Sequence, residues 1–338
     1  MKRIFSVFLA VMIAAAALCW NGISAKAADA KRLSVVTTIF PEYDWVRQIL
    51  GDKFSDADVT MLLDNGVDLH SYQPTVDDMV RIANCDLFIY VGGESDGWVE
   101  NALKNAVNKD MKVINLLEVL GDSVKAEETV EGMQEEENDH DHEDADEHED
   151  AEEHEHEEEA EYDEHVWLSL RNAETLCEAI SDALQRINPD NQDTYAANTA
   201  AYAERLAALD ADYRAAVDAA TYQTVLFGDR FPFRYLADDY GLSYYAAFVG
   251  CSAETEASFE TITFLAGKMD ELNLPCVLTI EGAQHRIAQT IVENTATKNQ
   301  EVLTMDSMQS TTSKDVEKGA TYLSIMEQNL SVLKEALG

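Results

Sequence analysis

The histidines of this 338-residue chain gather in one acidic segment, which makes metal binding the first chemistry to consider. The segment from Glu127 to Glu164 contains 23 Asp and Glu residues and no Lys or Arg. Five of the eight histidines lie within it: His140, His142, His148, His154 and His156. Imidazole and carboxylate groups bind transition metals, whereas this composition cannot bury enough apolar surface to fold. We therefore predict a disordered, metal-collecting loop over residues 127–164, against the alternative of a solvated acidic spacer with incidental histidines.

The remaining histidines are His70, His165 and His285. His70 lies in the turn-rich NGVDLHSYQPT, after an apolar run, so we expect it at the carboxyl edge of a sheet. His165 lies in DEHVWLSL, where apolar residues resume directly after the acidic segment. Either could instead be a surface or packing histidine, but both positions suit a metal ligand. We expect His285 to be a surface residue on a helix, with a supporting position behind the metal ligands as the alternative.

Two carboxylates follow apolar runs in the second half of the chain. Glu281 ends CVLTIE and Asp306 follows EVLTM. Acids at strand ends are costly to bury unless a cation or metal compensates them. A salt bridge for Glu281 and a helix N-cap for Asp306 are the alternatives.

Two series of short strand-like runs define the fold class. LSVVTT, DVTMLL, DLFIYVGG and KVINL alternate with helical segments before the acidic segment, and TVLFG, YYAAF, CVLTIE and EVLTM do so later. A helical pattern from Gln192 to Ala219 predicts one continuous helix about 40 Å long. We predict an α/β fold of two βα lobes with mostly parallel sheets, joined by this rigid helix, with the ligand site in the cleft between the lobes. The predicted limits are 31–190 for the first lobe, 191–219 for the helix and 220–338 for the second lobe.

Charge and cysteine content exclude several classes of function. The net charge of -41 argues against nucleic acid or anionic lipid as a partner. No CxxC pair is present, so we do not expect a thiolate zinc site. We expect the cysteines of the folded chain to be buried free thiols, with a disulfide between Cys251 and Cys276 as the alternative.

The first 27 residues have the pattern of an export signal. Lys2 and Arg3 precede an apolar run from Ile4 to Trp20, and small residues end at Ala27. We expect cleavage there and a protein that works in the periplasm or on the outer face of the cytoplasmic membrane. Lipid attachment at Cys19 is the alternative, weakened by the large Leu18 before it.

Several motifs together resemble one protein family. NGVDLHSYQPTVDD, DEHVWLSL, the long helix, DDYGL before YYAAF, and MDSM followed by TYLSIMEQNLSVLKEAL resemble the solute-binding proteins of zinc and manganese ABC importers, which have a rigid interdomain helix. The similarity runs from about Leu33 to the end of the chain. An acidic, histidine-rich insertion is similar to that of the zinc-importing members. The resemblance implies metal ligands at His70, His165 and Asp306.

The third ligand of that family has no counterpart here. Members resemble HxxFxYxxxxYGL at this point, whereas the chain reads RFPFRYLADDYGL and places Arg230 at the ligand position. Arginine stays protonated and cannot bind a metal ion. Glu281, Asp229 or water could complete the site, or Arg230 could pair with one of those acids and leave three ligands. We favour Glu281, which gives the predicted set His70, His165, Glu281 and Asp306.

The predicted function is capture of Zn²⁺ outside the cytoplasm and delivery to the membrane permease of an ABC importer. Clustered imidazoles favour zinc over Mn²⁺, and the loop would raise the zinc concentration near the cleft. We expect a monomer that is not an enzyme. A zinc-dependent hydrolase is one alternative, although the chain lacks an HExxH pair. A metal-buffering surface adhesin, in which the loop itself is the function, is the other.

Overall fold

The computed structural model describes residues 32–134, 161–252, 256–282 and 285–338. The predicted export signal and the five loop histidines lie outside these ranges. Within them, the chain contains two sheets, each of four parallel strands. The two-lobe α/β prediction is confirmed, while the exact lobe limits stay predictions.

The first lobe is built on the sheet order β2-β1-β3-β4. Its strands are β1 (Leu33–Thr37), β2 (Ala57–Met61), β3 (Leu87–Tyr90) and β4 (Lys112–Asn115). Its helices are α2 (Phe40–Leu50), α3 (Val76–Asn84), α4 (Val99–Lys104), α5 (Leu116–Leu120) and α6 (Leu170–Ile187). Val35 in β1 pairs with Val59 on one side and Leu87 on the other, which places β1 in the interior of the sheet. Parallel pairing brings the carboxyl ends of all four strands to one edge.

The second lobe repeats this arrangement with the order β6-β5-β7-β8. Its strands are β5 (Thr224–Phe231), β6 (Ser243–Val249), β7 (Cys276–Ile280) and β8 (Glu301–Met305). Its helices are α8 (Arg234–Tyr240), α9 (Phe259–Leu272), α10 (Arg286–Asn294), α11 (Ser313–Glu317) and α12 (Tyr322–Leu337). All five residues of β7 are buried, as expected for an inner strand covered on both faces.

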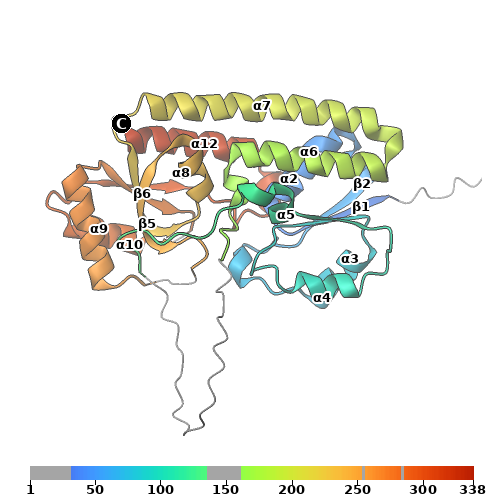
Figure 1. Cartoon of the computed structure of the whole chain (residues 1–338), viewed down its shortest axis with the longest axis horizontal. Helices are drawn as coiled ribbons and strands as arrows, with labels where there is room; N and C mark the ends of the chain where they lie inside the picture. Colours follow the sequence, from blue (N-terminus) through green and yellow to red (C-terminus); the bar gives the residue numbers. More distant parts are fainter. Residues whose placement is uncertain (1–31, 135–160, 253–255, 283–284) are drawn as a thin grey trace, which may run out of the picture. The chain divides into compact units, whose positions relative to one another are not determined.

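The long helix α7 (Gln192–Asp218) has 27 residues and joins the lobes. In Figure 1 it runs along both of them, beside α6 and α12. Its buried stripe consists of Tyr195, Thr199, Tyr202, Leu206, Leu209, Tyr213 and Val217. Asn198 donates to the carbonyl of Ile49 in α2 at 2.9 Å, and Tyr213 donates to the carbonyl of Met326 in α12 at 2.7 Å. The helix is therefore tied to both lobes.

The predicted disordered loop of 127–164 is too long at both ends, because residues 127–134 and 161–164 are structured. An antiparallel bridge joins Ala126 to Tyr162, and the amide of Gln134 donates to the carbonyl of Ala247 at 2.9 Å. Met133 is buried there, with 8 % of its surface exposed. Backbone hydrogen bonds and this one apolar anchor order the ends, which an argument from overall composition overlooks.

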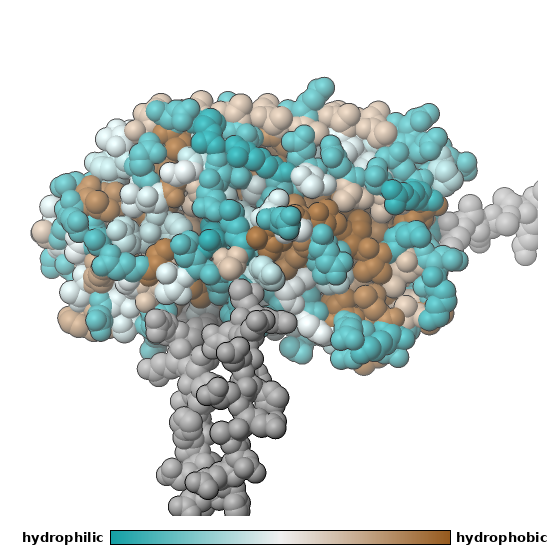
Figure 2. Space-filling model, viewed as in Figure 1, coloured by the Kyte–Doolittle hydropathy of each residue, from teal (hydrophilic) through white to brown (hydrophobic). Residues whose placement is uncertain are grey.

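The surface seen in Figure 2 is largely hydrophilic, with a hydrophobic area on the side of the first lobe where α5 lies. Large apolar side chains exposed in that lobe include Val80 in α3, Val113 in β4 and Val119 in α5. Within the described residues, none of the helices is both long and apolar enough to cross a membrane.

Candidate metal centre

His70 is held by the loop that follows β2. It lies in a short 3-10 turn, Leu69–Ser71, whose N-cap Asp68 accepts a hydrogen bond from the His70 amide at 3.0 Å. Its Nδ1 lies 2.8 Å from Ser95 Oγ. With Nδ1 engaged, Nε2 is the nitrogen left for another partner.

His165 is fully buried and precedes a second 3-10 turn, Val166–Leu168. Its backbone amide and its Nδ1 both contact Asp163 Oδ1, at 2.9 and 3.0 Å. A carboxylate on Nδ1 fixes the ring orientation and makes Nε2 a more basic ligand.

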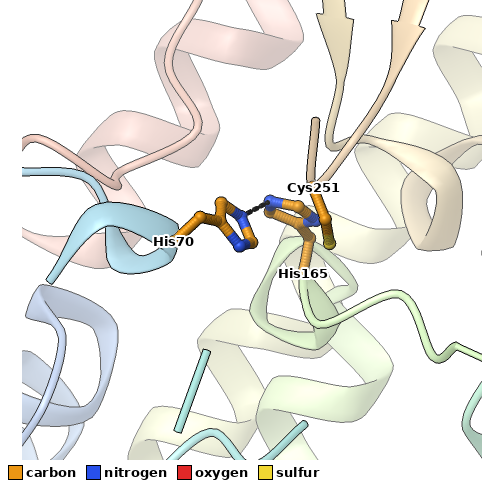
Figure 3. A group of neighbouring side chains, drawn as sticks. All are labelled: His70, His165 and Cys251. Carbon is orange, nitrogen blue, oxygen red and sulfur yellow. Dashed lines mark hydrogen bonds between the residues drawn. The ribbon is translucent and has the colours of Figure 1, made fainter. Parts of the chain in front are cut away.

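The two imidazoles face one another. His70 Nε2 and His165 Nε2 lie 3.3 Å apart, although 95 residues separate them in the sequence (Figure 3). Two nitrogens bound to one tetrahedral zinc ion, each at about 2.0–2.1 Å, would be separated by about 3.3 Å. The observed distance therefore matches one edge of a tetrahedral zinc site.

The electrostatic environment keeps His70 neutral. Burial, and then the neighbouring His165, lower the pKa of His70 below its usual value. Burial opposes ionisation of Asp68, but Arg230 and His70 outweigh it and lower the pKa of that carboxyl. Neutral imidazole is the charge state that binds a metal ion.

Arg230, on β5, points to the first lobe. Its Nη2 contacts Asp68 Oδ2 at 2.6 Å, and its Nη1 donates to the carbonyl of Ser252 at 3.2 Å. The alternative that Arg230 pairs with Glu281 or Asp229 is wrong, because the nearer Asp68 takes the charge. The Asp229 carboxylate accepts hydrogen bonds from the Thr279 hydroxyl at 2.7 Å and from the backbone amide of Arg230 at 2.9 Å, not from its guanidinium.

Glu281 and Asp306 lie close enough to influence each other. Glu281 accepts hydrogen bonds from the amide of Ser307 at 2.6 Å and from its hydroxyl at 2.8 Å. Burial, and then the charge of Glu281, raise the pKa of Asp306 to about 7. Neither acid forms an ion pair with a basic side chain in the described part of the chain. The proximity of the two acids therefore favours a proton or a cation on Asp306.

A cysteine, not a carboxylate, completes the group around the histidines. Across residues 32–134, 161–252, 256–282 and 285–338, the structure contains one group of three metal-ligating side chains: His70, His165 and Cys251. Their ligand atoms lie within 4.8 Å of one another (Figure 3), and Glu281 and Asp306 are not part of this group. Cys251 follows β6 and has no metal-ligand spacing in the sequence, so no local motif could have identified it.

The four cysteines of the described chain form no disulfide with one another. Cys177 and Cys276 are buried free thiols, as expected, and Cys251 is a half-buried free thiol. Cys85 is buried as well, and its Sγ donates to the carbonyl of Ile82 at 3.2 Å. The alternative disulfide between Cys251 and Cys276 is therefore wrong.

The candidate residues of the second lobe all lie near the carboxyl ends of its strands. Arg230 is near the end of β5, and Cys251, Glu281 and Asp306 follow β6, β7 and β8. This edge meets the first lobe, since Trp167 Nε1 donates to the carbonyl of Ser307 at 2.9 Å. The contact lies two residues after His165 and one after Asp306.

A cavity of about 830 Å³ is lined mainly by residues of the second lobe. Its lining includes Asp68, Arg230, Glu281 and His285. His285 is half-buried and its Nδ1 lies 3.2 Å from Thr279 Oγ1. The expectation of a surface histidine on a helix is thus wrong, because His285 is the N-cap of α10 and turns toward the cavity.

Comparisons with known proteins identify the family of the chain. The family described as "Zinc-uptake complex component A periplasmic" (ZnuA) matches residues 35–336. The zinc-binding lipoprotein AdcA of Streptococcus pneumoniae is 31% identical over 310 residues, 92% of this chain and 56% of AdcA. The chain thus spans little more than half the length of that relative. The high-affinity zinc uptake system protein ZnuA of Bacillus subtilis is 31% identical over 323 residues, which cover 95% of this chain and 93% of that protein.

Solved structures extend the likeness to three dimensions. The Zn(II)-bound ZnuA-like domain of S. pneumoniae AdcA superposes with a TM-score of 0.68 at 27% identity, covering 90% of this chain and 99% of that domain. The match to the family extends over both lobes and the helix between them. The chain therefore belongs to the ZnuA family of zinc-uptake components.

Proposed function

We propose that this protein captures Zn²⁺ outside the cytoplasm and delivers it to the membrane permease of an ABC importer, acting as a monomer. The observation that carries the proposal is the 3.3 Å separation of the two Nε2 atoms of His70 and His165. Each ring is held from behind through Nδ1, by Ser95 or by Asp163. Imidazoles that are oriented in this way and lie at this spacing match two corners of a tetrahedral zinc site.

Carboxylates of the second lobe supply the charge that the imidazoles lack. We propose that Asp306 joins His70 and His165 when zinc binds, with Glu281 beside it as a further ligand or as its charge partner. The pKa of Asp306, raised to about 7 by burial and by Glu281, supports this role, because a divalent cation would relieve the repulsion between the acids. The Trp167–Ser307 contact already brings the two lobes together at this point.

The acidic segment has a separate role in the proposal. Its histidines, His140, His142, His148, His154 and His156, collect zinc weakly and raise its concentration near the cleft. Delivery to a permease requires capture in the periplasm or on the outer face of the membrane. The family description names a periplasmic component, and AdcA is named a lipoprotein. Attachment of a lipid at Cys19 would anchor the protein to the outer face of the membrane.

Zinc titration against a chromophoric chelator tests the proposal. The full chain should bind one zinc ion tightly, and His70→Ala should weaken this site at least about 100-fold, since even residues behind a ligand cost about 10–100-fold. His285→Ala is the matched control, because His285 lines the cavity but lies outside the proposed site. Tight binding that survives His70→Ala would contradict the proposal.

The same titration separates the two alternatives. Deletion of residues 135–160 should leave the tight site in place, whereas a metal-buffering adhesin would lose all its zinc with the loop. A hydrolase would need a general base at an open zinc position. The matching family is described as a zinc-uptake component, which gives the hydrolase no support.

A further inference from the structure

We propose that Cys251 is a zinc ligand, so that the site combines two imidazoles, one thiolate and one carboxylate. This inference rests on the proposed function and specifies its binding chemistry. The structural reason is the convergence of Cys251 Sγ with one ring nitrogen each of His70 and His165, all within 4.8 Å (Figure 3).

The distances suit a sulfur ligand. A tetrahedral zinc ion with Zn–S of about 2.3 Å and Zn–N of about 2.0–2.1 Å separates sulfur from nitrogen by about 3.6 Å. Sγ and one ring nitrogen of each histidine lie within 4.8 Å of one another, up to roughly 1 Å beyond this spacing, so the Cys251 side chain has to turn about χ1 to bind the ion.

The backbone around Cys251 is held in place from two directions. Arg230 donates to the carbonyl of Ser252 at 3.2 Å, and the amide of Cys251 donates to Glu127 Oε1 at 3.0 Å. Gly250 lets the turn approach His165, since a Cβ on Gly250 would lie 3.0 Å from His165 Cε1. The backbone next to the thiol is thus held by Arg230 of β5 and by Glu127, the first residue of the acidic segment.

Arg230 has a clear place in this arrangement. It cannot bind zinc itself, and its guanidinium spans from Asp68, which caps the His70 turn, to Ser252, which follows Cys251. It therefore connects the supports of two proposed ligands, one from each lobe, as a positioning residue.

The charges balance when the site is filled. Binding forms a Zn–S bond and breaks the S–H bond of Cys251, and the proton leaves to solvent. One thiolate and one carboxylate then neutralise Zn²⁺, while both imidazoles stay uncharged. Thiolate is a soft ligand that favours zinc over Mn²⁺, so Cys251 would sharpen the choice of metal.

Cobalt(II) is the probe that reports a thiolate directly. The full chain loaded with one equivalent of Co²⁺ should show a thiolate-to-metal charge-transfer band in the near ultraviolet, which Zn²⁺ abolishes on displacing it. Cys251→Ser should lose the band and bind Zn²⁺ at least about 100-fold more weakly, with Mn²⁺ binding little changed. Cys276→Ser is the matched control and should keep the band, since Cys276 is also a free thiol but is not part of the group around the histidines.

Two results would overturn the inference. One is a wild-type Co²⁺ spectrum without the band, which requires no variant and so does not depend on whether Cys251→Ser folds. The other is unchanged zinc affinity in Cys251→Ser. Either result, with tight zinc binding by the wild type, leaves the proposed function standing. Absence of tight zinc binding by the wild type would instead overturn the proposed function as well.

Discussion

At the scale of single residues, the candidate site depends on groups that orient the ligands. Asp163 is buried, with 2 % of its surface exposed, and contacts both the amide and Nδ1 of His165. The His165 ring therefore has one orientation, with Nε2 facing His70. A buried imidazole held in this way loses little entropy when it binds a metal ion.

Asp163→Asn tests this orienting role. The amide keeps an oxygen near Nδ1 but removes the negative charge, so we expect zinc affinity to fall by about 10–100-fold. Chelator competition measures the change. Asp190→Asn, at an exposed turn between α6 and α7, is the charge-matched control and should bind zinc as the wild type does. Equal zinc affinities of the two variants would mean that the Asp163 charge does not strengthen zinc binding by His165.

The sequence identified some of these residues and could not identify others. His70 and His165 stand in distinctive motifs, and the structure places their Nε2 atoms 3.3 Å apart. Cys251 has no such motif, because its position depends on how the turn after β6 packs against His165. Asp68 as the partner of Arg230 was also missed, since that ion pair crosses between the lobes over 162 positions of sequence.

At the scale of elements, the start of α2 contains a buried acid that helps position the first lobe. Glu42 is fully buried and accepts hydrogen bonds from the amides of Thr38 at 2.8 Å and Ile39 at 3.3 Å. Burial, and then the nearby Asp96, raise the pKa of Glu42 from its usual 4.5 to about 8. Asp96 adjoins Ser95, the partner of His70, so this acidic pair lies directly behind the candidate site.

This raised pKa predicts how stability depends on pH. The folded chain holds a proton on Glu42 more tightly than the unfolded chain does, so this contribution to stability is complete below about pH 4.5. It is lost as the pH rises toward 8, at up to about 1.4 kcal/mol per pH unit. Glu42→Gln is neutral at every pH, so its free energy of unfolding should exceed that of the wild type by a margin that widens between pH 5 and pH 8.

Urea unfolding of both proteins at pH 5 and pH 8 measures this margin. Glu178→Gln, on an exposed position of α6, is the control and should show a constant difference from the wild type. A Glu42→Gln margin that does not change with pH would place the Glu42 pKa near its ordinary value.

Periodicity predicted the elements themselves better than their ends. The strands and helices were recognised because apolar residues alternate or recur every three to four positions. The ordered ends of the acidic segment were not, because their backbone bonds to Lys125 and Ala247 leave no pattern in the side chains. Composition predicts that a segment has too little apolar surface to form a core. It does not predict which backbone carbonyls accept hydrogen bonds from the amides of that segment.

At the scale of the whole molecule, the two lobes meet where the candidate ligands lie. Arg230 of the second lobe pairs with Asp68 of the first, and Trp167 of the first bonds to Ser307 of the second. The helix α7 ties the lobes together at a distance from these contacts, through α2 and α12. Zinc bound between the lobes would add one more link at this junction.

The central claim is that one zinc ion binds where the two lobes meet. Anomalous diffraction at the zinc absorption edge, from crystals of the full chain grown with one equivalent of Zn²⁺, locates the ion without reference to any variant. The account predicts one strong peak within about 2.0–2.1 Å of both His70 Nε2 and His165 Nε2. An anomalous peak elsewhere, with no zinc between these two imidazoles, would contradict the account.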